Sequence, residues 1–332
     1  MKENFGEVIQ GQFEKLLETH VDRDLLEKAD GQSMFRDLWA VVEKSGFCLA
    51  LVSEANGGIG LNPVLAFQLI TAASYFGLPL PFGETMVVSG ALNTPLAGPA
   101  TLSGGAGGKH PKVAYGADAD HVLVARDGKW LLAPASSITS QRGNNLAGEP
   151  RDALSVTNGV PHDPAPWLED GNLDSLGALV RAAQMRGAMQ RALEMSIAYA
   201  QDREQFGRSI SKFQAVQHML ADAAGELAAA GALVDNAAET WGGPDFTFCA
   251  ALAKSRTGEA AGKLSEIAHQ VHGAIGFTKE HDLNFFSRRL WSWRDEFGSD
   301  AVWQEYIGRK VCRDGGAALW DRIISATQGA VA

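Results

Sequence analysis

The stretch REQFGRSISKFQAVQ, residues 203–217, determines how the rest of this sequence is interpreted. Arg203 carries a permanent charge and a planar set of donors, which makes it the side chain best suited to a pyrophosphate. Phe206 is of a type found more often in a core than against a ligand. From Phe213 onward, apolar residues such as Val216 recur at helical spacing. The stretch therefore predicts a candidate anion-binding arginine just before a long helix.

The stretch QVHGAIGFTKEHD, residues 270–282, adds a second group of candidate ligand contacts. The amides of Gln270, and of Gln214 in the first stretch, can donate or accept hydrogen bonds toward phosphate, ribose or adenine. Gly273 and Ala274 have little or no side chain, so a cofactor can approach their backbone closely. Each group also has a structural explanation, because a polar residue near a helix end is commonly just solvated.

The periodicity divides the chain into three regions. Residues 1–97 and 169–332 carry apolar residues at helical spacing, whereas residues 98–168 contain short apolar runs separated by turn residues. Residues 121–125 and 129–133 predict a β-hairpin, because the Asp-Gly pair between them accepts the positive φ angles of a tight turn. We therefore expect a mainly α-helical protein, with an amino-terminal helical domain, a small middle β domain and a carboxy-terminal helical bundle at these bounds.

The composition excludes several functions. A net charge of −10 and an isoelectric point near 5.3 argue against a nucleic-acid surface, which needs a local excess of Lys and Arg. No apolar run reaches the roughly 18 residues of a membrane span, and residues 1–20 lack the apolar core of a signal peptide, so we expect a cytoplasmic protein. Cys48, Cys249 and Cys312 have neither disulfide nor zinc spacing, so we expect no metal and three small core residues.

Both stretches closely resemble paired motifs of the acyl-CoA dehydrogenase family. The first is similar to that family's Arg-x-x-Phe-Gly … Phe-Gln … Leu-Ala-Asp motif, and the second to its Gln-x-x-Gly-Gly-x-Gly-Phe motif. Weaker similarities lie at residues 53–61 and at Pro79, Pro81, Glu84 and Thr85, so the resemblance covers nearly the whole chain. It implies the fold of the family, in which a small β domain lies between two helical domains.

The resemblance also implies FAD as the cofactor. In the family, the matched positions of one subunit reach the adenosine and pyrophosphate of the FAD that its neighbour mainly holds. The residues of this chain to which the resemblance assigns FAD contacts are Arg203, Phe206, Gln214, Gln270, Gly273 and Ala274.

The sequence departs from the family at the catalytic base, the carboxylate that takes the α proton of the thioester while hydride passes from the β carbon to flavin. In most members this base is the Glu of a Tyr-Glu-Gly-Thr stretch, and its place falls here on Phe297. In a minority it lies before the first motif, at the place of Gly177. Glu296 remains as a neighbouring candidate, although a shift of one residue turns a helical side chain by about 100°.

The middle region departs from the family as well. The Thr-Glu-Pro … Gly-Ser-Asp loop and the Gly-x-Lys-x-Trp-Ile strand, which cradle the flavin ring in the family, are missing between residues 96 and 124. A Gly-rich stretch at residues 102–108 predicts a surface loop there instead. We therefore expect this chain to have lost its own flavin-ring pocket.

This combination resembles the shorter subunit of heteromeric α2β2 bacterial acyl-CoA dehydrogenases, which act on sterol side chains and similar bulky substrates. The resemblance implies α,β-desaturation of an acyl-CoA thioester by a heterotetramer. A longer partner subunit then supplies the base and most of the FAD site, electrons pass to an acceptor such as electron-transfer flavoprotein, and this chain alone is inactive. Two alternatives remain, namely a homomeric dehydrogenase that uses Glu296, and a non-catalytic assembly or regulatory protein without flavin.

Overall fold

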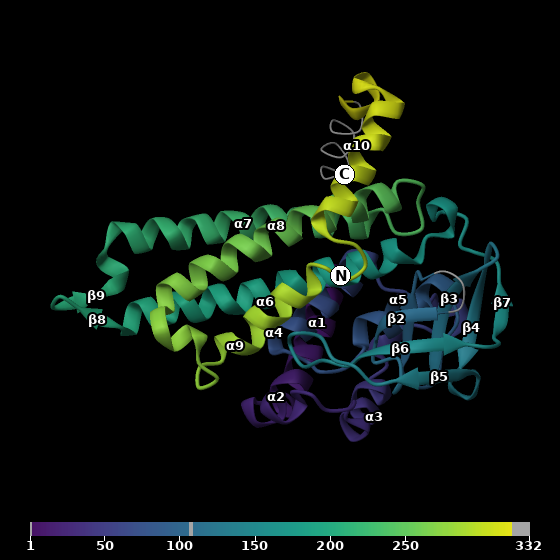
Figure 1. Cartoon of the computed structure of the whole chain (residues 1–332), viewed down its shortest axis with the longest axis horizontal. Coiled ribbons are helices and arrows are strands. Elements are labelled where there is room, and N and C mark those ends of the chain that lie inside the picture. The colour runs from purple at the N-terminus through teal and green to yellow at the C-terminus, as the bar shows by residue number, and fades with distance from the viewer. Residues whose placement is uncertain (1, 106–108, 321–332) are drawn as a thin grey trace.

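The computed structural model of this chain describes residues 2–105 and 109–320 (Figure 1). Long helices of the carboxy-terminal part run along the long axis of the molecule, while most strands gather at one end of it. The first helices of the chain pack below the long ones in this view. The expected mainly α-helical fold with a small β region is confirmed.

The α-helices follow the predicted helical spacing. Their bounds are α1 Lys2–His20, α2 Arg23–Ala29, α3 Arg36–Lys44, α4 Pro63–Phe76, α5 Phe82–Leu92, α6 Leu173–Asp202, α7 Gln214–Glu239, α8 Phe246–His272, α9 Leu283–Trp293 and α10 Asp300–Asp314. Helix α4 shows how local sequence sets these bounds. The side chain of Asn62 accepts from the Val64 amide at 2.9 Å, and Pro63 occupies the first turn, where no amide donor is needed. Gly77 ends the helix with a φ of 78°.

The strands of the middle region form two sheets, with the orders β1-β3-β4-β7 and β2-β6-β5. Their bounds are β1 Ala100–Ser103, β2 Lys109–Ala114, β3 His121–Arg126, β4 Lys129–Pro134, β5 Ile138–Gln141, β6 Arg151–Val156 and β7 Val160–His162. The predicted hairpin is confirmed, because β3 pairs antiparallel with β4 and Arg126 faces Lys129. Asp127 and Gly128 take φ angles of 50° and 74° in its turn.

The expectation of a surface loop at residues 102–108 is wrong at its beginning. Leu102 and Ser103 complete strand β1, which pairs in parallel with β3, and the Leu102 side chain is fully buried. The strand was not predicted because it has only four residues, too few to show a clear alternation of apolar and polar side chains beside the glycines. Residues 106–108 lie outside the described part of the chain.

Helices α6, α7 and α8 pack side by side and form the centre of the bundle (Figure 1). Helix α4 packs against α6 where Gly187 allows a close approach, since a Cβ atom there would lie 2.1 Å from the carbonyl oxygen of Thr71. The cysteines do not all join the core as expected. Cys48 is buried and Cys249 half-buried, but Cys312 is exposed on α10. Among the described residues, no helix combines the length and apolar character needed to cross a membrane.

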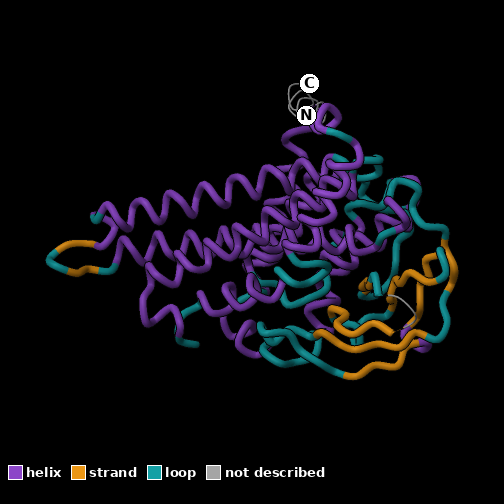
Figure 2. Tube along the Cα trace, turned by 45° about the horizontal axis from the view of Figure 1, so that its top comes forward, coloured by secondary structure: helices purple, strands orange, loops and turns teal. Residues whose placement is uncertain are grey.

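Helix α6 connects two distant parts of the molecule. Its first turns lie beside the β region, and its last residue leads into the short hairpin of β8 (Glu204–Gln205) and β9 (Arg208–Ser209). Figure 2 shows this hairpin at the opposite end of the bundle from the other strands. At 1.5 Å per residue, Gly177 and Arg203 lie roughly 40 Å apart along the helix. The two groups of candidate residues therefore occupy separate sites.

Candidate functional site

The residues to which the resemblance assigns FAD contacts lie at the same end of the bundle, on three different helix ends. The end of α6, the start of α7, and the end of α8 with the following turn η6 (Gly273–Phe277) all lie at this end (Figure 1). The assigned residues, all exposed, are Arg203, Phe206, Gln214, Gln270, Gly273 and Ala274. We call this set the bundle-end surface. Its residues face solvent, so any ligand they hold must approach from outside the chain.

The chemistry of the bundle-end surface suits an anion attached to a flat ring. Among the described residues, no carboxylate forms an ion pair with Arg203, so its guanidinium remains available. Phe206 is 90% exposed at the tip of the hairpin, where it takes a φ of 54°. The interpretation of Phe206 as a core residue is therefore wrong. A Cβ atom at Gly273 would meet nothing within 4 Å, so the backbone there is open.

The two positions of the family's base meet at the other end of α6. A Cβ atom at Gly177 would lie 2.2 Å from the Phe297 ring, so this ring occupies the space of any side chain at position 177. Helix α9 ends at Trp293, which places Phe297 in a turn with a φ of 54° rather than on a helix. The prediction that Glu296 and Phe297 lie on a helix is therefore wrong. Neither position offers a carboxylate.

Glu296 is held by two buried arginines. Its carboxylate accepts from Arg151 Nε at 2.7 Å, from Arg181 Nε at 2.6 Å and from the Asn145 amide at 3.0 Å. Burial by itself raises the pKa of Glu296, but the two guanidinium groups outweigh this and hold the pKa at about 2. A carboxylate with so low a pKa is a weak base, and its lone pairs are already committed to these donors.

The pairs around Glu296 extend into a larger buried network. Arg181 also donates to Glu84 at 2.8 Å. Glu149 accepts from Arg151 at 2.9 Å and from Arg289 at 3.1 Å. The members are Glu84, Glu149, Arg151, Arg181, Arg289 and Glu296, and we call this set the six-charge network. Its three cations balance its three anions. Arg181 further lies 5.3 Å from the centroid of the Phe297 ring.

The sequence analysis missed the arginines of the six-charge network. The available signal was the position of Arg181 within the otherwise apolar run LGALVRAA, residues 176–183, because a charge in a buried helix requires a partner. Nothing in the sequence shows that Arg151 and Arg289 meet the same carboxylates. Such contacts depend on the packing of three separate regions.

Cavities of very different size lie on the two sides of this network. A cavity of about 640 Å³ opens between the β region and the turn after α9, and Asp174, Glu296 and Phe297 are among its lining residues. On the other side, the cavity that contains Glu84 and Arg181 has a volume of only about 20 Å³. The network and the Phe297 ring therefore separate an open cavity from a nearly filled one.

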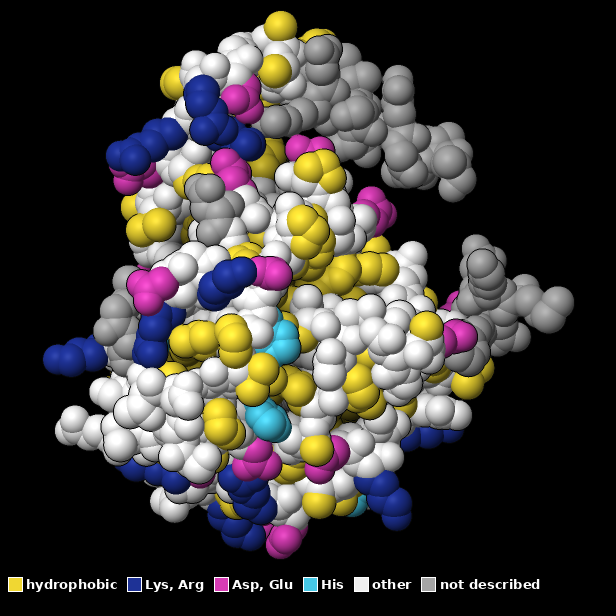
Figure 3. All heavy atoms as spheres, turned by 90° about the vertical axis from the view of Figure 1, so that its right-hand side faces the viewer, with side chains coloured by type: hydrophobic (Ala, Val, Ile, Leu, Met, Phe, Trp, Pro, Cys, Tyr) yellow, Lys and Arg dark blue, Asp and Glu magenta, His cyan; other side chains and the backbone are white. Residues whose placement is uncertain are grey.

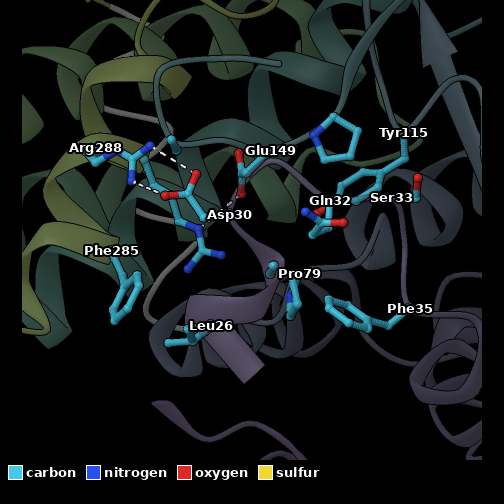
Figure 4. A pocket seen from close by; sticks show the side chains of 14 residues that line it. Leu26, Asp30, Gln32, Ser33, Phe35, Pro79, Tyr115, Glu149, Phe285 and Arg288 are labelled. Atoms are coloured by element: carbon cyan, nitrogen blue, oxygen red, sulfur yellow. Dashed lines mark hydrogen bonds and ion pairs between the residues drawn. The ribbon is translucent and has the colours of Figure 1, made fainter. Parts of the chain in front are cut away.

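A further cavity of about 20 Å³ lies where the amino-terminal region meets α9 (Figure 4). Asp30 pairs there with Arg288 at 2.9 Å, and Glu149 lies beside them. Because the arginine bonds to it, the pKa of Asp30 lies below its usual value despite partial burial. This contact fixes the loop after α2 against α9, so the six-charge network is enclosed from this side as well.

The face that carries β3, β4 and β7 shows no feature that points to a different kind of binding site. Figure 3 shows Lys and Arg side chains on this face interspersed with Asp and Glu, without a large patch of one sign. The described part of the chain contains no cluster of three or more His, Cys, Asp or Glu side chains arranged to bind a metal.

Comparisons with known proteins bear on the family that this chain resembles and on its fold. Residues 175–312 match the family described as "Acyl-CoA dehydrogenase, C-terminal domain". The chain is 29% identical to acyl-CoA dehydrogenase IpdE2 of Mycolicibacterium smegmatis over 82% of its own length and 88% of that protein. The resemblance to the acyl-CoA dehydrogenase family, whose cofactor is FAD, is thus confirmed over residues 175–312.

Solved structures show the same fold over nearly the whole chain. A chain of the ChsE4–ChsE5 complex from Mycobacterium tuberculosis superposes with a TM-score of 0.80 at 22% identity, covering 92% of this chain and 97% of that one. A chain of the Tcur3481–Tcur3483 steroid ACAD gives a TM-score of 0.82 at 20% identity, with 96% and 100% covered. At these identities the likeness concerns the fold.

We expect Glu296→Gln to lower the free energy of unfolding at pH 7 by about 3–5 kcal/mol, because Arg151 and Arg181 each lose one of two carboxylate partners and the buried network keeps one excess positive charge. The folded pKa of about 2 lies below the unfolded value of about 4.3, so this contribution is complete above about pH 4.5 and disappears toward pH 2. The measurement is urea unfolding of both proteins from pH 7 to pH 3.

The exposed pair of Glu305 and Arg309 supplies the control, since Glu305→Gln should change stability by less than about 1 kcal/mol. A difference for Glu296→Gln that does not shrink at low pH would contradict this account.

We also expect Gly177→Ala to destabilise the chain by about 1–3 kcal/mol, because the added methyl group meets the Phe297 ring. In a Phe297→Ala background the same substitution should be neutral or stabilising, since Ala is the better helix former by about 1 kcal/mol. Unfolding free energies of the four proteins in this double-mutant cycle give the coupling. Equal costs in both backgrounds would show that the ring does not fill the space at position 177.

Proposed function

We propose that this chain is the non-catalytic subunit of a heteromeric FAD-dependent acyl-CoA dehydrogenase, in which a longer partner subunit supplies the catalytic base. The observation that carries the proposal is the contact between Phe297 and Gly177, since it removes both of the family's base positions from this chain. Both of the solved relatives described above are named as pairs of different proteins, which supports a heteromeric assembly.

The bundle-end surface fits the outer half of FAD. Arg203 is exposed and without an ion pair among the described residues, and it would hold the pyrophosphate. Phe206 offers an exposed aromatic face for the adenine ring, and the open backbone at Gly273 admits a close approach. Because this surface lies roughly 40 Å from Gly177 along α6, the FAD that it contacts would serve the active site of another subunit.

The large cavity of this chain suits the flavin ring poorly. Asp174 and Asp295 line it, against Lys112, while Glu296 and Arg151 in its wall are paired with each other. When bound, FAD supplies the hydride acceptor of the reaction, so negative charge develops on the ring during turnover. Carboxylates facing the ring oppose that charge. We therefore place the flavin ring in the partner.

In this assembly the residues of this chain would bind and orient FAD, but none of them would transfer a proton. Arg203 neutralises the pyrophosphate, while Gln214 and Gln270 donate toward the adenosine half and fix its position. The substrate class is an acyl-CoA thioester, with a bulky sterol-type side chain suggested by the steroid ACAD of the same fold. Electron-transfer flavoprotein is the proposed acceptor of the electrons.

The two alternatives receive less support from the structure. A homomeric dehydrogenase would need Glu296 to act as a base, yet both of its oxygens are bound by arginines and its pKa is about 2. A subunit without flavin would have no use for an exposed arginine beside an exposed aromatic ring. The FAD content of the assembled complex distinguishes that alternative from the proposed function.

We expect the purified chain alone to show negligible reduction of an artificial electron acceptor with octanoyl-CoA or a steroid-side-chain CoA thioester, because loss of a positioned base costs about 10² to 10⁴ in rate. Co-expression with the partner should yield a heterotetramer with about one FAD per pair of unlike chains, measured by light scattering and flavin absorbance. One FAD per chain, or turnover by this chain alone that is lost in Glu296→Gln, would refute the proposal.

We further expect Arg203→Ala to weaken FAD binding by the reconstituted complex roughly 10- to 100-fold, because a charge-assisted hydrogen bond is worth about 1.5–3 kcal/mol. Arg203→Lys should restore only part of the affinity, since an ammonium keeps the charge but loses the two-pronged geometry. Arg309→Ala removes another exposed arginine, on α10, and serves as the control. Thermal melts check that each variant is folded. Unchanged FAD affinity in a normally assembled Arg203→Ala complex would mean that Arg203 is only a surface charge.

A further inference from the structure

We infer that Arg181 and its ion pairs fill the space beside the two base positions of this chain, so that an acyl chain cannot be buried there. The inference rests on the proposed function, which assigns the catalytic base to the partner. It adds that this chain lacks a substrate site as well as a base, and it names the residue that fills the site.

The position of Arg181 supports this inference. Gly177 and Phe297 mark where a base would meet the α carbon of a bound thioester, and Arg181 follows Gly177 by about one turn of the same helix. Its guanidinium lies 5.3 Å from the centre of the Phe297 ring and is only 1% exposed. Arg181 therefore lies next to both base positions and lines the small cavity, whereas Phe297 itself lines the cavity of about 640 Å³.

The space left around Arg181 is too small for an acyl chain. Apolar side chains of α4 and α5, including Ile70 and Phe82, line a cavity of only about 20 Å³ there. One water molecule needs about 10–15 Å³, whereas a benzene-sized ligand needs roughly 150 Å³. Two buried polar atoms without a partner among the described residues, Glu84 Oε2 and Arg181 Nη2, belong to residues that line this cavity. The cavity thus suits one bridging water rather than an alkyl chain.

The bonds of Arg181 keep it in this place. Its Nε donates to Glu296 at 2.6 Å and its Nη1 donates to Glu84 at 2.8 Å, while the side-chain oxygen of Gln184 accepts a further bond. An alkyl chain that entered would separate buried charges from their partners and give them nothing in exchange. The balanced charge of the six-charge network also leaves no net attraction for an anionic group.

The larger cavity does not provide another route for the acyl chain. Arg151 lines both cavities, and its bond to Glu296 continues through Arg181 to Glu84. This row of ion pairs forms the wall between them. Apolar side chains such as Leu102, Leu146 and Trp291 line part of the cavity of about 640 Å³, but this row of charges separates them from the space around Arg181.

The test compares octanoyl-CoA with free CoA by isothermal titration calorimetry on the full chain. The wild-type chain should bind the two within twofold of each other, because the acyl group gains no burial. An affinity for octanoyl-CoA at least tenfold above that for CoA would overturn the inference. The flavin content of the complex is measured separately, so the proposed function can fail or stand independently of this result.

The second part of the test uses a variant that opens the space around Arg181. Arg181→Met together with Glu84→Gln and Glu296→Gln removes the cation and its counter-charges at once, and should give at least a tenfold preference for octanoyl-CoA. On the same helix, Arg186→Met with Asp235→Asn removes a partly exposed pair of 2.6 Å and should give no preference. A folded triple variant without the preference would refute the role of Arg181. If circular dichroism shows that the triple variant is unfolded, the wild-type comparison decides alone.

Discussion

The guanidinium of Arg181 lies between Glu84 of α5 and Glu296 of the turn after α9, and this double ion pair holds three parts of the chain together. Burying such charges is expensive, and a well-packed apolar set of the same volume is often at least as stable. The network is therefore not explained by stability alone. Its consequence is steric and electrostatic, because it fills with charge a place that would otherwise be an apolar cavity.

Helix α6 separates the two base positions, which carry no carboxylate, from the exposed bundle-end surface. At one end of the helix, Gly177 lies under the Phe297 ring and the space beyond it is filled. At the other end, Arg203 and Phe206 remain exposed and open to a ligand. Because α6 is one continuous, largely buried helix of 30 residues, the filled end is a rigid support for the open end.

Much of the fold was predictable because its signals are local. Helical spacing predicted the bundle, and the Asp127-Gly128 turn predicted the hairpin. Strand β1 was missed because four residues beside glycines carry little periodicity. The six-charge network was missed for another reason, since its partners lie far apart in sequence.

The candidate site was predictable only in part. Counting from a motif placed Phe297 and Gly177 at the two base positions, but it did not show that they touch. It also suggested a helical Glu296, whereas the end of α9 at Trp293 puts that residue in a turn facing two arginines. Whether a carboxylate is free or paired depends on how distant parts of the chain pack together. This packing cannot be predicted from the local patterns of a single sequence.

The contact between Gly177 and Phe297 also constrains the evolutionary future of this chain. A glutamate at position 177 has no room while the ring is present, and a glutamate at position 297 would add an unbalanced anion beside Glu296. Either route back to catalysis passes through a poorly folded intermediate unless several residues change together. Under the proposed function, the loss of the base is therefore difficult to reverse, and the chain stays dependent on its partner subunit.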